Sequence, residues 1–177
     1  MVISRILAAI SVVSMLLLAG CDKGLAPPVP EPWTEFSGFS GVLHFQNWPP
    51  VDSVQELRVV AFHKYPSDSS SILQLLISGE AVVFPPIGTK SLLRYGADTI
   101  SYVMTTDSTS LAVGTYEYVV VAQKYGPNIF ADWAPAGLYT KNLGSFDPSP
   151  VEVIFHRITP GYDIYVDFHK PPPKPWQ

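Results

Sequence analysis

The chain is poor in the residues on which metal sites and many catalytic sites depend. It has a single cysteine in 177 residues, so an internal disulfide is excluded and stability must come from packing and sheet hydrogen bonds. A glycine-rich phosphate loop and a GxSxG nucleophile elbow are both absent from the sequence. The four histidines fall in no HxH, HxxH or HExxH pattern; they are His44, His63, His156 and His169. We therefore expect no metal, no cofactor and no enzymatic activity.

Charged residues are also few. They make up 15% of the chain, and the formal net charge is −4. A mildly acidic surface argues against a nucleic-acid partner and against electrostatic docking on anionic lipid. The low charge is accompanied by 18 prolines and nine tyrosines, a composition that favours a β protein with many proline-containing turns.

Long apolar runs are absent after the first twenty residues. The one such run extends from Ile6 to Ala19 and is interrupted only by Ser11 and Ser14. It is shorter than the roughly 20 apolar residues that a membrane-spanning helix needs. Arg5 is the only charged residue before it. A positive start followed by a short apolar segment predicts a secretory signal peptide over residues 1–20.

The single cysteine follows this segment directly. The residues Leu18, Ala19, Gly20 and Cys21 resemble the lipobox of bacterial lipoproteins: an aliphatic residue, two small residues and a cysteine. The resemblance implies cleavage before Cys21 and attachment of lipid, including palmitate-type acyl chains, to the new N-terminus. Two or more acyl chains hold a protein firmly on a membrane. The alternatives are an ordinary signal peptide with a chance cysteine, and a plain anchor helix.

The lipobox resemblance also bears on location. It implies a protein of the bacterial cell envelope whose polypeptide lies in aqueous space such as the periplasm. Asp22 follows the cysteine, and in enteric bacteria an aspartate there resembles a signal for retention in the inner membrane. Sorting rules differ between bacterial groups, and most envelope lipoproteins of bacteria with two membranes reside in the outer one. We therefore favour the outer membrane over the inner membrane.

Proline-rich segments mark the ends of the folded region. Residues 22–35 carry four prolines, and proline holds its neighbours in extended geometry, so residues 21–35 are expected to form a lipidated, semi-rigid linker. Residues 170–177 are similar and predict an unstructured or polyproline tail. Such a tail can also be interpreted as a ligand for a proline-recognition groove. The folded domain is then expected over residues 36–169.

Alternation of apolar and polar residues predicts strands within this domain. A short helix is expected near residues 69–78, because Ile72, Leu75, Leu76 and Gly79 have helical spacing; an edge strand is the alternative. Six or seven strands with at most one helix indicate an antiparallel β-sandwich. The predicted strands cover residues 41–46, 54–65, 80–84, 99–106, 111–125, 151–157 and 162–169.

One of these strands carries a second resemblance. The segment "LAVGTYEYVVVA", with Leu111, Gly114, Thr115 and Tyr116, is similar to the L-x-x-G-x-Y strand entry of transthyretin-like and carboxypeptidase-regulatory-like domains. The closing segment 151–168 also resembles their terminal strands. The resemblance implies that the glycine makes the turn into a core strand and that the tyrosine packs across the sandwich. Domains of these families act as accessory, adhesive or scaffolding units.

The segment 126–150 is aromatic, long and without a clear period, and it is predicted to be a loop. Loops of this length in a compact domain are usually functional or disordered. Its aromatics can stack on sugar rings, anchor an envelope protein, or fold back to cap the sandwich. We therefore expect a structural or protein-interaction module, with a carbohydrate-binding lipoprotein using residues 125–139 as the alternative. The candidate binding surface consists of Trp48, Tyr125, Phe130, Trp133 and Tyr139.

Overall fold

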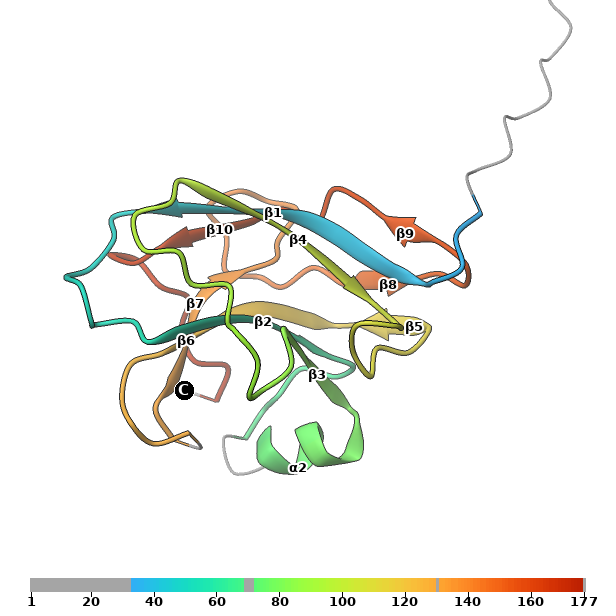
Figure 1. The fold of residues 1–177 in the computed structure, drawn as a ribbon, viewed down its shortest axis with the longest axis horizontal. Coiled ribbons are helices and arrows are strands. Elements are labelled where there is room, and N and C mark those ends of the chain that lie inside the picture. Colours follow the sequence, from blue (N-terminus) through green and yellow to red (C-terminus); the bar gives the residue numbers. More distant parts are fainter. Residues whose placement is uncertain (1–32, 69–71, 130, 177) are drawn as a thin grey trace, which may run out of the picture. The chain divides into compact units, whose positions relative to one another are not determined.

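The structure describes residues 33–68, 72–129 and 131–176. This part of the chain contains ten strands and one short helix. The structure is a computed structural model, and the described residues belong to the unit that begins at Trp33. The predicted signal peptide, Cys21 and Phe130 lie outside the described residues. The elements are β1 (Gly38–Gln46), β2 (Glu56–Phe62), α2 (Ile72–Ser78), β3 (Ala81–Phe84), β4 (Thr99–Thr105), β5 (Gly114–Tyr116), β6 (Tyr118–Lys124), β7 (Trp133–Leu138), β8 (Val151–Val153), β9 (Ile158–Thr159) and β10 (Ile164–Asp167) (Figure 1).

Most of the strands form one mixed sheet in the order β3-β2-β6-β7-β10-β1-β4, and β9 adds to β1. The prediction of a β protein with one short helix is confirmed. The prediction of purely antiparallel pairing is wrong, because β1 pairs in parallel with both β9 and β10. Alternation within a strand identifies the strand but not its partner, so this parallel pairing left no local signal. A separate two-stranded sheet joins β5 to β8.

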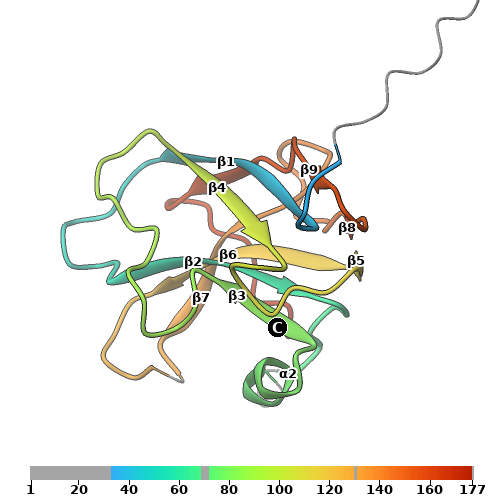
Figure 2. The ribbon, with the colours of Figure 1, turned by 45° about the vertical axis from the view of Figure 1, so that its right-hand side comes forward.

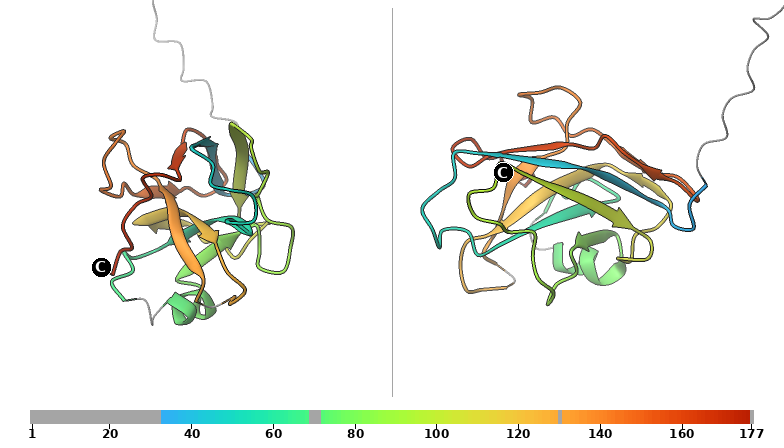
Figure 3. Two further views of the ribbon diagram at one scale, coloured as in Figure 1. Left: turned by 90° about the vertical axis from the view of Figure 1, so that its left-hand side faces the viewer. Right: turned by 45° about the horizontal axis from the view of Figure 1, so that its top comes forward.

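The mixed sheet curls so that its two halves face each other. Figures 1 and 3 show β1, β4 and β10 in one layer, β2, β3 and β6 in the other, and β7 crossing between them. Alternate side chains of both halves point into the space between the layers and form the main core. The largest fully buried members of this core are Phe39, Leu43, Leu57, Val59, Val82, Met104, Tyr116, Val119, Val121, Val151, Ile164 and Val166.

The opposite face of the β2–β6 half carries a second apolar cluster. Val60 and Phe62 of β2 and Tyr118 and Val120 of β6 are buried there, outside the main core. Helix α2 covers part of this face, and its Ile72, Leu75 and Leu76 pack against the cluster (Figure 2). The helix predicted near residues 69–78 is thus observed over Ile72–Ser78, while residues 69–71 lie outside the described residues. Burial on both faces makes β2 and β6 interior strands.

The predicted strand over residues 111–125 is divided in two. β5 ends at Tyr116 and β6 begins at Tyr118, and the two strands belong to different sheets. One unbroken strand over residues 111–125 would place Tyr116 and Tyr118 on the same face, and that expectation is wrong. Tyr116 is fully buried in the main core, whereas Tyr118 belongs to the outer cluster. The break at Glu117 changes the direction of the chain, which simple alternation over one long strand does not reveal.

The predicted loop over residues 126–150 contains a central strand. β7 lies between β6 and β10, with Pro135 opposite Ala122 at an irregularity in the register. Proline and glycine inside a run argue against a strand, and β7 contains both, so its pattern predicted a loop. Gly137 is needed for close packing, because a Cβ there would lie 2.7 Å from Val166 Cγ2 and 2.8 Å from the Tyr165 carbonyl oxygen.

Candidate functional site

The five aromatics predicted to form one binding surface are not gathered in one place. Trp48 lies at one end of the main core, where its ring contacts Phe45 and Phe168 at centroid distances of 5.0 and 4.7 Å. Its indole Nε1 donates a hydrogen bond to the carbonyl oxygen of Ala97 at 3.0 Å. Trp48 is therefore half-buried and closes one end of the main core.

Tyr139 also belongs to the core. It is 7% exposed and packs edge-on against Tyr162 with 5.1 Å between ring centroids. Burial raises the pKa of its hydroxyl above the ordinary value. Tyr125, in contrast, is 46% exposed, and Phe130 lies outside the described residues. Trp133, the remaining member of the predicted surface, lines a cavity together with other apolar side chains.

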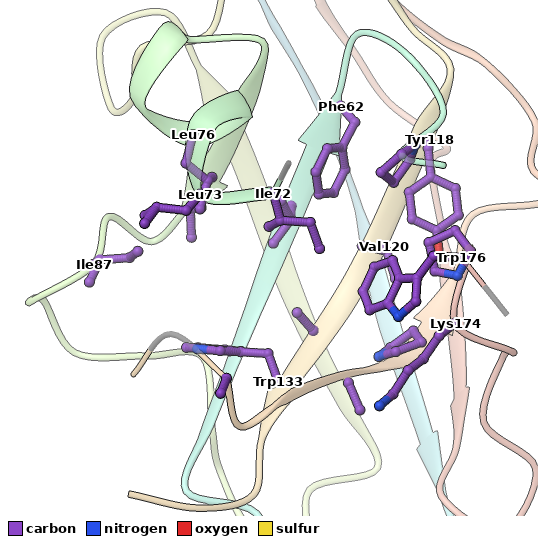
Figure 4. A pocket seen from close by; sticks show the side chains of 18 of the residues that line it. Phe62, Ile72, Leu73, Leu76, Ile87, Tyr118, Val120, Trp133, Lys174 and Trp176 are labelled. Atoms are coloured by element: carbon purple, nitrogen blue, oxygen red, sulfur yellow. The ribbon is translucent and has the colours of Figure 1, made fainter. Parts of the chain in front are cut away.

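That cavity has a volume of about 600 Å³ and lies over the outer face of β2, β6 and β7. Helix α2 bounds it on one side, Ile129 and Ala131 before β7 on another, and residues 174–176 of the C-terminal tail on a third (Figure 4). We call it the outer pocket. The residues that line it are Val60, Phe62, Pro66, Ile72, Leu73, Leu76, Val83, Ile87, Tyr118, Val120, Ala122, Ile129, Ala131, Trp133, Ala134, Pro135, Lys174, Pro175 and Trp176.

Local hydrogen bonds hold the wall that Ile129 and Ala131 line. The Asn128 amide donates to Asp132 Oδ2 at 2.8 Å, and the Asp132 amide donates back to the Asn128 carbonyl oxygen at 3.0 Å. Trp133 Nε1 donates to the Ile129 carbonyl oxygen at 2.8 Å. Gly126 is buried beneath this turn, and a Cβ there would clash with the Asp132 carboxylate. The turn thereby presents Ile129 and Trp133 to the outer pocket.

The wall formed by the C-terminal tail was not expected. Residues 171–176 contain no helix or strand, in keeping with their prolines, but Pro172 is buried. Lys174, Pro175 and Trp176 line the outer pocket, and Figure 4 shows Lys174 and Trp176 across the pocket from helix α2. The one signal in the sequence was a tryptophan among the prolines, which gives the tail a large apolar side chain to bury.

Among the described residues, Lys174 is the only charged one that lines the outer pocket. Its side chain makes no hydrogen bond or ion pair with any described residue. On the pocket floor, burial raises the pKa of the Tyr118 hydroxyl above its ordinary value, and the neighbouring Tyr65 adds to the rise. Tyr118 is therefore neutral at physiological pH, and Lys174 carries the one charge among the described residues that line the pocket.

Arg58 is a buried cation whose partners all lie within the domain. Arg58 is 2% exposed and bonds to Glu56 through Nε at 2.9 Å and through Nη2 at 2.5 Å. Its guanidinium also donates to the carbonyl oxygens of Pro85 at 2.7 Å, Pro86 at 2.9 Å and Thr89 at 2.8 Å. Its five N–H donors are thus all used, two by Glu56 and three by carbonyl oxygens of the turn after β3, so Arg58 ties that turn to β2 and has no donor left for a ligand.

Histidines and acids do not form a metal site in the described residues. His44 stacks on Tyr165, and His63 stacks on Tyr116, with centroid distances of 4.6 and 4.0 Å. Within residues 33–68, 72–129 and 131–176, no group of three or more histidine, cysteine, aspartate or glutamate side chains is placed to hold a metal ion. No helix in the same part of the chain has the length and apolar character to cross a membrane.

Comparisons with protein-family models, with curated proteins and with solved structures found no match to this chain.

Proposed function

We propose that this protein is a lipid-anchored lipoprotein of the bacterial cell envelope whose β domain is a non-enzymatic structural or protein-interaction module. The observation that carries the proposal is the position of Cys21, the only cysteine, directly after the apolar run and two small residues. An exported protein with one thiol needs a special explanation for it, and acylation supplies one. The outer membrane is the favoured location.

The outer pocket supports the idea of an interaction module. Three apolar residues at its margin are exposed: Leu73 by 47%, Ile87 by 50% and Ile129 by 42%. They continue the apolar lining of the pocket onto the surface. Contiguous exposed apolar surface beside a concavity marks interaction sites in soluble domains.

We also propose kinship with the transthyretin-like and carboxypeptidase-regulatory-like β-sandwich domains. Three residues of the L-x-x-G-x-Y segment support it. Leu111 is buried, Gly114 has a positive φ of 142° that favours glycine, and Tyr116 is fully buried. The Tyr116 hydroxyl accepts a hydrogen bond from the Ala112 amide at 2.9 Å and donates to its carbonyl oxygen at 3.2 Å. A buried tyrosine tied to the backbone upstream is a recurrent feature of β-sandwiches.

The carbohydrate-binding alternative has less support. Sugar platforms present several exposed rings together, and of the four candidate aromatics that the structure describes, Tyr125 alone is exposed by about half. Trp133 turns its indole N–H back to Ile129, and Tyr139 lies in the core. A protein or apolar partner is therefore the better match to this surface.

The proposal is tested by replacing the acylation residue in the full chain. Cys21→Ala should abolish incorporation of a labelled palmitate analogue and release the protein from the membrane fraction. Asp22→Asn is the matched control, because it changes the neighbouring residue and leaves the thiol in place, so it should remain acylated and membrane-bound. Continued acylation of Cys21→Ala would overturn the proposal.

A further inference from the structure

We propose that the outer pocket binds the hydrocarbon chain of one long-chain fatty acid and that Lys174 pairs with its carboxylate. The inference rests on the proposed function only in placing the domain close to a membrane, which supplies such ligands. The argument for the ligand class comes from the pocket itself, in three steps.

The first step is the chemistry of the lining. Apart from Lys174, every residue that lines the pocket is aliphatic, aromatic or proline. The indole N–H of Trp133 already has a partner in the Ile129 carbonyl oxygen. A ligand rich in hydroxyl groups would lose its hydrogen bonds to water here and gain few in return. A cavity of about 600 Å³ with this lining suits a small apolar ligand.

The second step concerns the backbone of the pocket floor. β2 and β6 are interior strands, because β2 pairs with β3 and β6, and β6 pairs with β2 and β7. Their backbone N–H and C=O groups are bonded within the sheet, so an extended peptide lying across this face would find no ladder partners. A hydrocarbon chain brings no such groups and loses nothing by lying there.

The third step is charge. Lys174 is half-buried and lines the tail end of an apolar cavity, and its ammonium group has no partner among the described residues. Of the common single-chain lipids, one with a carboxylate head complements this arrangement directly, because charge-assisted hydrogen bonds are the stronger kind. Its chain would then run from Lys174 towards Leu73 and Leu76 of helix α2, over Val120 (Figure 4).

The test uses the full chain in phosphatidylcholine vesicles and palmitate that carries a photoreactive diazirine. Irradiation should give saturable labelling, and mass spectrometry should locate it in peptides that line the outer pocket. Unlabelled palmitate should compete for the labelling, and octanoate, whose chain is too short to fill the pocket, should compete far less well. Hexadecanol, with the same chain and no charge, should compete roughly tenfold less well than palmitate.

Two pairs of variants separate the chain contact from the head contact. Lys174→Gln should weaken palmitate binding roughly tenfold and leave hexadecanol competition unchanged. Lys170→Gln, four residues earlier and outside the lining, is the control and should bind palmitate as the wild type does.

Leu73→Glu places a charge at the margin of the pocket and should abolish saturable labelling. Ile77→Glu, on the same helix but outside the lining, should not. Both helix positions are exposed, so these changes spare the core.

The possible results are distinct. Equal competition by palmitate and hexadecanol, together with an unaffected Lys174→Gln variant, would overturn the role of Lys174. Absence of saturable labelling would overturn the fatty-acid proposal, as would crosslinks that join the pockets of two copies of the chain. None of these results alters the acylation of Cys21, which is measured separately, so failure of this inference is distinguishable from failure of the anchoring proposal.

Discussion

The indole Nε1 of Trp133 lies 2.8 Å from the carbonyl oxygen of Ile129 and donates a hydrogen bond to it. This contact joins the first residue of β7 to the turn that precedes it. It also orients two apolar side chains of the outer pocket at once, since both residues line the cavity. The positions of Ile129 and Trp133 in the pocket therefore depend on hydrogen bonds near the turn. Substitutions that remove these hydrogen bonds should change the shape of the pocket.

The first prediction concerns Asp132, whose carboxylate accepts a hydrogen bond from the Asn128 amide in the same turn. Asp132→Ala removes the acceptor of the Asn128 amide, and that amide is then left to water. We expect a loss of about 1 kcal/mol in the free energy of unfolding. Amide hydrogen exchange should become faster in residues 126–133 and stay unchanged in β1 and β10. Asp147→Ala, at an exposed position outside the helix and strands, is the control. Unchanged exchange at Asn128 would contradict this account of the turn.

A second prediction follows from the packing of Gly126 against the same carboxylate. Gly126→Ala forces its new methyl group into Asp132. We expect it to destabilise the fold by about 1–3 kcal/mol, which urea unfolding would measure. In an Asp132→Ala background the obstacle is gone, so the same change should have a much smaller effect. Equal losses in the two backgrounds would place the strain elsewhere.

The sequence predicts those strands whose two faces differ clearly. In β10, Ile164 and Val166 are fully buried while Tyr165 between them is exposed, as alternation predicts. In β4, Ile100 and Tyr102 are likewise buried on one face. Long-range relationships left no such signal. The parallel pairing of β10 with β1 depends on the path of the whole chain, and no local pattern encodes it.

The candidate site was harder to predict because its parts come from segments that resemble loops. β7 contains Pro135 and Gly137, which argue against a strand, yet Pro135 lies at a register irregularity and Gly137 lies in close contact with β10. The C-terminal tail has a composition typical of an unstructured segment. What it packs against is set by the outer apolar cluster, which forms only after β2 and β6 pair. Trp133 was identified as a candidate from sequence, whereas Lys174 and Trp176 were not.

A third prediction tests the buried guanidinium of Arg58. Arg58→Ala leaves the carbonyl oxygens of the turn after β3 without donors and leaves Glu56 with only the more distant Lys124, 3.5 Å away. Removing one partner of a buried ion pair destabilises proteins by about 3–5 kcal/mol. We expect a loss of that size for Arg58→Ala in urea unfolding.

Arg58→Lys should recover only part of that loss, because an ammonium group cannot match the planar, forked donors of the guanidinium. Arg94→Ala is the control, since Arg94 is exposed, and it should change the free energy of unfolding by less than about 0.5 kcal/mol. If Arg58→Lys matched the wild type, the geometry of the hydrogen bonds would not be what stabilises this turn.

The last prediction concerns alkaline pH. Burial raises the pKa of the Tyr102 hydroxyl well above its ordinary value, and nearby Asp163 raises it further. The folded state therefore holds this proton more tightly than the unfolded chain does, where the pKa is about 10. The stabilisation is fully present below pH 10 and is lost as the pH rises above it, by about 1.4 kcal/mol per pH unit for each such tyrosine. Burial raises the pKa of Tyr118 in the same direction.

Urea unfolding between pH 8 and pH 11 would measure this effect. Tyr102→Phe should be about 1 kcal/mol less stable than the wild type at pH 8, because the hydroxyl donates a hydrogen bond to the Tyr162 carbonyl oxygen at 2.6 Å. Above pH 10 the variant should lose stability less steeply than the wild type, since one ionisable group is gone from the core. Tyr125→Phe, at an exposed position, is the control for the substitution itself. Parallel pH profiles for Tyr102→Phe and the wild type would show that ionisation of this buried hydroxyl does not limit the alkaline stability of the fold.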